Sequence, residues 1–454
     1  MTGKVSENKL TADFVNLYLA NLDLLREGAA DSINAARADA IENFNILGFP
    51  NRKSEKYKYT NITNLFEKEF EKYFAPRKVE FSVDDIFKCD VPSLDTNVLL
   101  LVNGYYFGNS KLEVMPNGVI MGSLAKAALQ YPEIVNRHYG RYADVSEESL
   151  VALNTAFAQD GIFLYVPKST VLEKPIQIIN ILLSDEALLT QPRNLFVLEE
   201  NSQTKVVVCD HTLSPQNFLT NSATEVFAGK GSNFEYVRMQ NEHNGSYHIS
   251  NIYIHQEATS VVNTNTITLH GGVVRNNINV ALVGEGAENH IYGLSLVDKT
   301  QHVDNYSFVD HAVPNCVSNE LFKNVMDDMA TGAFNGRILV RKDAQKTQAS
   351  QTNNNLLLTD DARIYTKPQL EIYADDVKCS HGATVGQMDE EALFYMRARG
   401  IGMHEARLLQ MFGFAHDVIQ KITIEPLRIR VDELVDKRLR GELASCNTCA
   451  MHCC

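Results

Sequence analysis

The chain has 454 residues, of which 44% are hydrophobic and 22% charged, and its formal net charge is −14. This length allows two or three domains with well-buried cores. The composition excludes a largely disordered chain, a collagen-like chain and a coiled coil. The negative charge would repel a phosphate backbone, so we expect no general binding of nucleic acid.

The sequence shows no sign of membrane insertion or export. No apolar run reaches the roughly 20 residues that cross a bilayer, and residues 1–20 lack a basic segment followed by an apolar stretch. We therefore expect a cytoplasmic protein without membrane contact. Its eight cysteines are then expected to be reduced thiols rather than disulfides.

Residues 1–158 are expected to form a mostly helical α/β region. Apolar residues recur at three- and four-residue steps, which predicts helices over 10–25, 33–47, 62–74, 123–139 and 146–159. The aromatic residues of 62–74 are interpreted as core residues. A short strand is expected over 98–102.

The pattern changes over residues 159–385, which read as short strands without helices between them. The expected strands are 162–166, 176–183, 205–209, 234–239, 261–269, 277–282, 291–297 and 337–340. A sandwich, a barrel and a β-helix all fit this pattern. Asn- and Thr-rich alternate positions favour a stacked solenoid, in which like residues form ladders, although no strict repeat is visible.

Helical periodicity returns over residues 386–445. Asp389 is a plausible N-cap for a helix over 390–398, which Gly400 would end. Helices over 403–421 and 426–440 are expected to follow, the last with Pro426 in its first turn and Gly441 after its end. Residues 446–454 form a cysteine-rich tail.

Several familiar catalytic motifs fail on inspection. Gly229-Lys-Gly-Ser lacks the earlier glycine of a phosphate-binding loop, so we do not expect the chain to hydrolyse ATP. Gly284-Glu-Gly-Ala lacks the third glycine of a dinucleotide site. His404-Glu lacks the second histidine of a zincin, and no nucleophile elbow is present. None of these familiar catalytic sites is therefore expected.

Histidines gather in the strand region, where seven of the 13 lie between His243 and His311. Imidazoles can bind iron or zinc, but these are irregularly spaced and lie on separate strands. We interpret them as solvated side chains or as members of ladders along the stacked strands.

Cys379 and His381 form a sharper candidate site. In an extended strand, residues two apart project from one face, about 6.5–7 Å apart at the backbone. A thiolate and an imidazole suit iron, but an Fe–S cluster usually needs about four ligands, so the others would come from a neighbouring chain. A buried thiol beside a hydrogen-bonded histidine is the alternative.

Residues 375–401, DDVKCSHGATVGQMDEEALFYMRARGI, closely resemble the C-terminal signature of the SufB/SufD family of iron–sulfur assembly proteins. The resemblance extends to 48–60 (GFPNRKSEKYKYT), 152–157 (ALNTAF), 165–167 (YVP) and 172–176 (LEKPI). Tyr57 stands where relatives often have Trp. His381-Gly382 and Gly386-Gln387 resemble the SufD branch of the family.

This resemblance implies a right-handed parallel β-helix flanked by helical ends. It also implies a non-catalytic scaffold subunit that pairs with a SufB-like subunit, each binding one copy of the ABC-type ATPase SufC. His381, with Cys379 less certain, would lie at the SufB interface, where iron or a transient Fe–S cluster is handled and iron acquisition is supported. The isolated chain would carry no cofactor. Reduced flavin, proposed for the complex, has no readable motif here.

The C-terminal helices match the segment of the family that docks SufC. The residues expected to contact this partner are Glu390, Glu391, Leu393, Phe394, Arg397, Arg399, Gly400 and Ile401. ATP-driven pairing of two SufC subunits would then pull on these helices and open the seam between the scaffold subunits.

The tail departs from the family. Cys446, Cys449, His452, Cys453 and Cys454 offer enough soft ligands for zinc, copper(I) or a cluster fragment. An oxidation-prone terminus without metal is an equal alternative.

Two other functions stay open. One is a stand-alone metal chaperone that uses the histidines and the tail. The other is a carbohydrate-active β-helix enzyme, which the missing export signal disfavours. The sequence also leaves open whether the isolated chain forms a homodimer by adding strands at an exposed edge.

Overall fold

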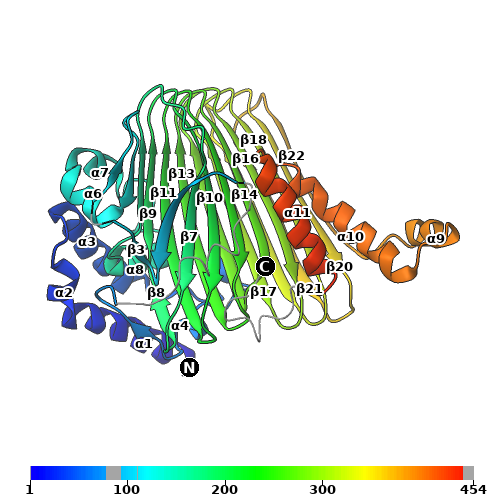
Figure 1. Ribbon diagram of the computed structural model, residues 1–454, viewed down its shortest axis with the longest axis horizontal. Helices are drawn as coiled ribbons and strands as arrows, with labels where there is room; N and C mark the ends of the chain where they lie inside the picture. The colour runs from blue at the N-terminus through cyan, green and yellow to red at the C-terminus, as the bar shows by residue number, and fades with distance from the viewer. Residues whose placement is uncertain (1, 78–93, 110, 443–454) are drawn as a thin grey trace.

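In this computed structural model the described residues are 2–77, 94–109 and 111–442, and most of them wind into a β-solenoid of about eight turns (Figure 1). Two parallel sheets face each other across its interior. The twelve-stranded sheet runs β21-β19-β17-β15-β13-β11-β9-β6-β5-β4, with β8 and β1 beside β11. The ten-stranded sheet runs β22-β20-β18-β16-β14-β12-β10-β7-β2-β3.

Each turn of the solenoid contributes one strand to each sheet. The strands of the twelve-stranded sheet are β6 (Ile162–Val166), β8 (Leu188–Thr190), β9 (Arg193–Leu198), β11 (Phe218–Ala228), β13 (Ser246–Gln256), β15 (Val273–Leu282), β17 (His302–His311), β19 (Thr331–Val340) and β21 (Arg363–Ile372). Those of the ten-stranded sheet are β7 (Ile176–Leu182), β10 (Gln203–Thr212), β12 (Asn233–Asn241), β14 (Val261–His270), β16 (Glu288–Val297), β18 (Val317–Met326), β20 (Gln348–Leu357) and β22 (Lys378–Gly386).

Strands also extend the sheets from the first part of the chain. They are β1 (Glu71–Lys72), β2 (Asn97–Val102), β3 (Tyr105–Phe107), β4 (Glu113–Val114) and β5 (Ile120–Ser123). The helices of this part are α1 (Thr2–Ala20), α2 (Leu22–Arg26), α3 (Asp31–Leu47), a 3₁₀ turn (Glu55–Tyr57), α4 (Thr63–Phe66), α6 (Leu124–Gln130), α7 (Pro132–His138) and α8 (Ser149–Phe157). The C-terminal helices are α9 (Glu390–Ala398), α10 (Met403–Ile419) and α11 (Glu425–Leu439). No helix among the described residues is long and apolar enough to span a membrane.

The expected solenoid with asparagine ladders is confirmed. Successive strands pair in parallel and in register, which places like residues on neighbouring turns. Asn276 donates to Asn305 over 3.0 Å and Asn324 donates to Asn355 over 2.7 Å, both inside the protein. Such ladders satisfy buried amides while the chain repeats its geometry.

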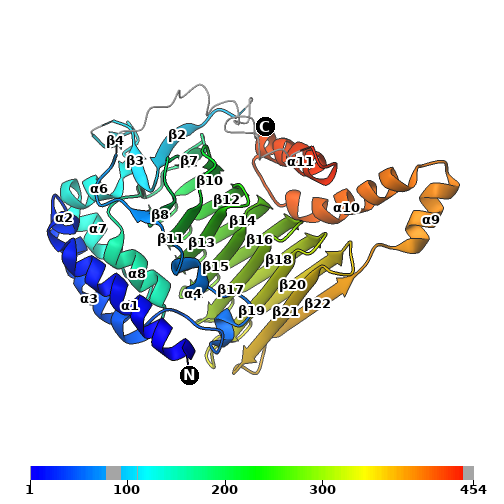
Figure 2. The same ribbon diagram turned by 90° about the horizontal axis from the view of Figure 1, so that it is seen from below.

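Three apolar layers hold the fold together. The solenoid interior contains residues such as Phe196, Phe234 and Phe334. Helices α10 and α11 cover the outer face of the ten-stranded sheet, and the N-terminal helices cover part of the outer face of the other sheet (Figure 2). Both faces of each sheet are therefore largely buried, as is usual for parallel sheets.

The segment 48–60, which carries part of the family resemblance, crosses the outer face of the twelve-stranded sheet. The Tyr57 hydroxyl donates to Glu148 over 2.6 Å, and Arg275 of β15 donates to the Lys56 carbonyl over 2.8 Å. Tyr59 stacks on Tyr365 of β21 with ring centroids 4.4 Å apart. This segment ties the N-terminal helices to the last turns of the solenoid.

Two sequence predictions need correction. The helix expected over 62–74 ends at Phe66, because Glu71 instead donates its N–H to Ala187 and β1 pairs with β8. The helix expected over 123–139 is two helices, α6 and α7. Pro132 has no N–H to continue the hydrogen-bond ladder, so α7 begins at that residue.

Candidate functional site

The last turn of the solenoid ends in two strands, β21 and β22, that each pair on one side only among the described residues. Figure 2 shows them at the end of the solenoid away from the N-terminal helices. Exposed apolar side chains lie on or beside these strands. They are Tyr365, Ile372, Tyr373 and Val385, which are 41–64% exposed. We call β21, β22 and these residues the open end.

Cys379 and His381 both lie on β22, so the expected extended strand is confirmed. Cys379 pairs in register with Ala349 of β20 and is half-buried against the solenoid core, whereas His381 pairs with Gln351 and is exposed. Burial raises the pKa of the Cys379 thiol. A metal held by this thiol would therefore have to displace a proton first.

Helix α9 carries the residues expected to contact the ATPase partner. Asp389 caps the helix as predicted, because its carboxylate accepts from the N–H groups of Glu391 and Ala392 over 3.0 Å each. Phe394 is 76% exposed, and Leu393 is buried, so Leu393 positions the helix rather than facing solvent. Of the other expected contacts, Glu390, Glu391, Arg397, Arg399 and Gly400 are exposed and Ile401 is partly buried.

The figures place α9 at the tip of an arm that extends away from the solenoid (Figures 1 and 2). Helix α10 forms the base of the arm and packs on β16 and β18. The arm thus joins the outer face of the ten-stranded sheet to an exposed helix.

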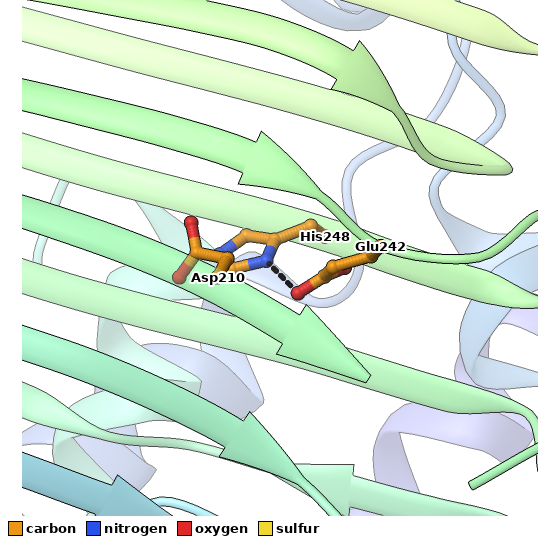
Figure 3. Close-up of side chains that lie close together, drawn as sticks. All are labelled: Asp210, Glu242 and His248. Atoms are coloured by element: carbon orange, nitrogen blue, oxygen red, sulfur yellow. Dashed lines mark hydrogen bonds and ion pairs between the residues drawn. The ribbon is translucent and has the colours of Figure 1, made fainter. Parts of the chain in front are cut away.

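A second cluster of metal-binding residue types lies inside the solenoid. Asp210, Glu242 and His248 are buried, and a donor atom of each lies within 4.8 Å of the others (Figure 3). His248 Nδ1 is 3.0 Å from Glu242 Oε1. A cavity of about 20 Å³, enough for one water molecule, lies beside them.

Arg238 already provides the positive charge of this cluster. Its Nε and Nη2 donate to Asp210 over 2.7 and 3.2 Å, and Nη2 lies 2.7 Å from His248 Nε2. Burial raises the pKa of Asp210, but the guanidinium outweighs that effect and the net shift is downward. Arg238 must donate to Nε2, so His248 carries its proton on Nδ1. Arg238 thus engages Asp210 and His248, and His248 engages Glu242. We interpret the cluster as a structural charge network.

No sequence pattern pointed to this network, because its members come from different turns of the solenoid. Of the seven clustered histidines, His248, His270 and His311 are buried, and each is within hydrogen-bonding distance of a neighbouring side chain. These three side chains are therefore hydrogen-bonded inside the protein rather than solvated.

A cavity of about 440 Å³ lies on the outer face of the twelve-stranded sheet. Aromatic residues such as Tyr253 and Phe308 line it together with charged residues. Several of those charges are already paired: Lys56 with Glu148, and Arg337 with Glu371. The tail ligands Cys446, Cys449, His452, Cys453 and Cys454 lie outside the described residues.

Two family models match the chain. One describes the N-terminal region of SufBD proteins and covers residues 8–178; the other describes the SufBD core domain of the SUF system for FeS cluster assembly and covers residues 181–414. The core model alone matches more than half of the sequence. The chain belongs to the SufBD family. It is therefore an iron–sulfur cluster assembly protein of a family that is not known for enzymes.

Relatives match this SufBD protein along most of its length. An iron–sulfur cluster assembly SufBD family protein of Synechocystis sp. is 28% identical over 423 residues, which are 91% of this chain and 90% of the relative. SufD of Escherichia coli is 28% identical over 400 residues, or 87% and 90%. SufD of Bacillus subtilis is 25% identical over 347 residues, or 72% and 76%.

Proposed function

We propose that this SufBD protein is a SufD-like scaffold subunit that pairs with a SufB-like subunit and binds one SufC-like ABC ATPase. Iron–sulfur clusters would be assembled on this complex and passed to other proteins, and the complex would support iron acquisition. The chain itself is non-catalytic, with ATP hydrolysis in the SufC-like partner. We assign no resident cofactor or reduced-flavin site to the chain, because iron and the transient cluster are cargo.

The observation that carries this proposal is the exposed His381 on β22, whose outer edge pairs with no other strand of the described residues. A free strand edge offers unpaired N–H and C=O groups to another chain. The exposed apolar side chains of the open end would be buried in such a contact. Cys379 and His381 supply two of the cluster ligands, so the remaining ligands would come from the SufB-like subunit.

The arm supports the second contact. Phe394 and Tyr395 on α9 are 76% and 59% exposed, and Arg397 and Arg399 lie beside them. An exposed aromatic pair flanked by arginines is typical of a protein interface. Because the arm packs on β16 and β18, a pull on α9 would be transmitted to the strands that precede the open end.

The charge network supports the scaffold over a stand-alone metal chaperone, because Arg238 engages Asp210 and His248 of the interior cluster. Metal binding by the cysteine-rich tail stays a prediction. A homodimer through the open end is the alternative assembly for the isolated chain.

The experiment is co-expression of the chain with the SufB-like and SufC-like proteins of its own organism, followed by co-purification. The wild type should retain both partners. Val385→Asp places a charge in the open end and should lose the SufB-like partner, while Val171→Asp is the matched control. These valines are 49% and 55% exposed, and Val171 lies between the early strands β6 and β7. A Val385→Asp protein that retains the SufB-like partner, or a wild type that retains neither, would refute the proposal.

A further inference from the structure

Glu320 on β18 is an unusual buried carboxylate. It is 2% exposed, and the Ser307 hydroxyl donates to its Oε2 over 2.5 Å. Its other oxygen, Oε1, has no hydrogen-bond partner among the described residues. Every other buried carboxylate in the described part of the chain pairs with arginine, lysine or histidine. These are Glu148, Asp210, Glu225, Glu235, Glu242, Asp304 and Asp310.

Glu320, Gln351 and His381 form a row of polar residues on three neighbouring strands, which we call the file; it runs from Glu320 in the interior to His381 at the open end. Glu320 pairs in register with Gln351 of β20, and Gln351 pairs with His381 of β22. Two strand spacings separate Glu320 from His381, which is about 9–10 Å. Gln351 is 1% exposed, and neither atom of its amide has a hydrogen-bond partner in the described residues.

A proton on Glu320 would satisfy this file. Glu320 Oε1 and both polar atoms of the Gln351 amide are buried without a partner among the described residues, and a proton on Glu320 Oε1 adds a donor to this group. Burial raises the pKa of Glu320 to about 7, although the Ser307 hydroxyl and the neighbouring Gln351 amide oppose the shift. The neutral and ionised forms are thus close in free energy near neutral pH.

Among the described neighbours of Glu320, only those at the open end can change its protonation through a change in their own charge. Ile291 of β16 is its partner on the inner side, and it is apolar. His311 of β17 is hydrogen-bonded to Ser318, and burial lowers its pKa to about 4, so it is neutral. Lys323 is paired with Asp417 of α10. The remaining neighbour in the file, beyond the uncharged Gln351, is His381.

We propose that Glu320 is the charge-compensating residue of the open end: it carries a proton while residue 381 carries no positive charge, and it releases that proton when positive charge is held there. The O–H bond breaks, its electron pair stays on the carboxylate, and the proton passes to water at the open end. The inference rests on the proposed function only in taking His381 as the place where a cation arrives. It assigns to the SufBD protein a buried acid that offsets the charge of its cargo.

The test uses infrared difference spectroscopy on the full chain without partners. The carboxylic-acid C=O band of a buried Glu320 should appear at pH 6 and disappear at pH 8.5, and Glu320→Gln should lack it. Positive charge is then fixed at the open end with His381→Lys and compared with the neutral His381→Gln. The midpoint of the band should lie about 0.5–1 pH unit lower in His381→Lys, the shift expected at this separation in a medium of intermediate dielectric.

Equal midpoints in His381→Lys and His381→Gln would overturn the proposal, and so would the absence of the band in the wild type. If Glu320→Gln does not fold, Ser307→Ala identifies the band instead. Loss of the hydroxyl that donates to Glu320 should raise its midpoint, and an unchanged midpoint would count against Glu320. None of these measurements needs a partner or a metal, so their failure is separate from a failure to form the SufB-like complex.

Discussion

Gln351 and His381 occupy paired positions on the adjacent strands β20 and β22, yet Gln351 is 1% exposed and His381 faces solvent. One turn of the solenoid is enough to bury a polar side chain. Another chain added on β22 would place His381 in the setting that Gln351 has now. The open end thus resembles the interior of the solenoid, except that no further turn among the described residues covers it.

Gly336 leaves space for the Gln351 amide. A Cβ at Gly336 would lie 2.3 Å from Gln351 Nε2 and 2.6 Å from Phe334 Cζ. We expect Gly336→Ala to lower the free energy of unfolding by about 1–3 kcal/mol, because the core must shift to admit it. Gly382→Ala is the control, since a Cβ there meets nothing within 4 Å. Urea unfolding of both variants checks this, and equal stabilities would contradict it.

Arg238 and Arg341 each bind an aspartate through two nitrogen atoms, but in different surroundings. Arg238 and Asp210 are 4% and 0% exposed at the side chain, whereas Arg341 is 58% exposed. Arg238→Met should cost about 3–5 kcal/mol of unfolding free energy, because it leaves the Asp210 charge buried without its partner. Arg341→Met should cost less than about 1 kcal/mol. Chemical denaturation measures both, and a small cost for Arg238→Met would refute the role of the charge network.

His311 gives the protein an acid-sensitive site. Burial lowers its pKa to about 4 from an ordinary 6.5, so the unfolded chain takes up the proton first as the pH falls. Its contribution to stability is complete above about pH 6.5 and is lost progressively as the pH falls toward 4. Between pH 7 and 5 the wild type should lose about 2 kcal/mol relative to His311→Gln, which can still bond Ser318. Parallel stability curves for the two proteins would contradict this.

The sequence was sufficient to predict the main architecture, because alternating polar and apolar residues and glycines between strands recur along the solenoid. Strand β22, the Asp389 cap and the asparagine ladders could be predicted from local pattern alone. The end of helix α4 at Phe66 could not be predicted, because the apolar residues of 62–74 have helical spacing. Tertiary structure overrides that spacing by burying Phe70 beside β8 and by pairing the following strand with the segment at Ala187.

The charge network and Glu320 were missed for another physical reason. Alternating polar residues in a strand usually indicate a face toward water, but in this solenoid polar positions such as Asp210 and Glu320 face the interior. Their partners stand elsewhere in the chain: Arg238 lies 28 residues from Asp210 and Ser307 lies 13 from Glu320. A polar interior could be recognised only once the register of the turns was known.

Neighbouring residues on α9 should separate binding from folding. Phe394 is 76% exposed and Leu393 is 4% exposed. Phe394→Ser should leave the melting temperature nearly unchanged, since surface substitutions usually alter stability by less than about 0.5 kcal/mol. It should nevertheless abolish co-purification of the SufC-like ATPase, because an exposed aromatic residue is a typical interface anchor. Leu393→Ala should instead lower the melting temperature, since it removes a buried contact of α9. If Phe394→Ser still carries the ATPase at wild-type stoichiometry, the arm is not the docking site, and the partner must bind elsewhere on the chain.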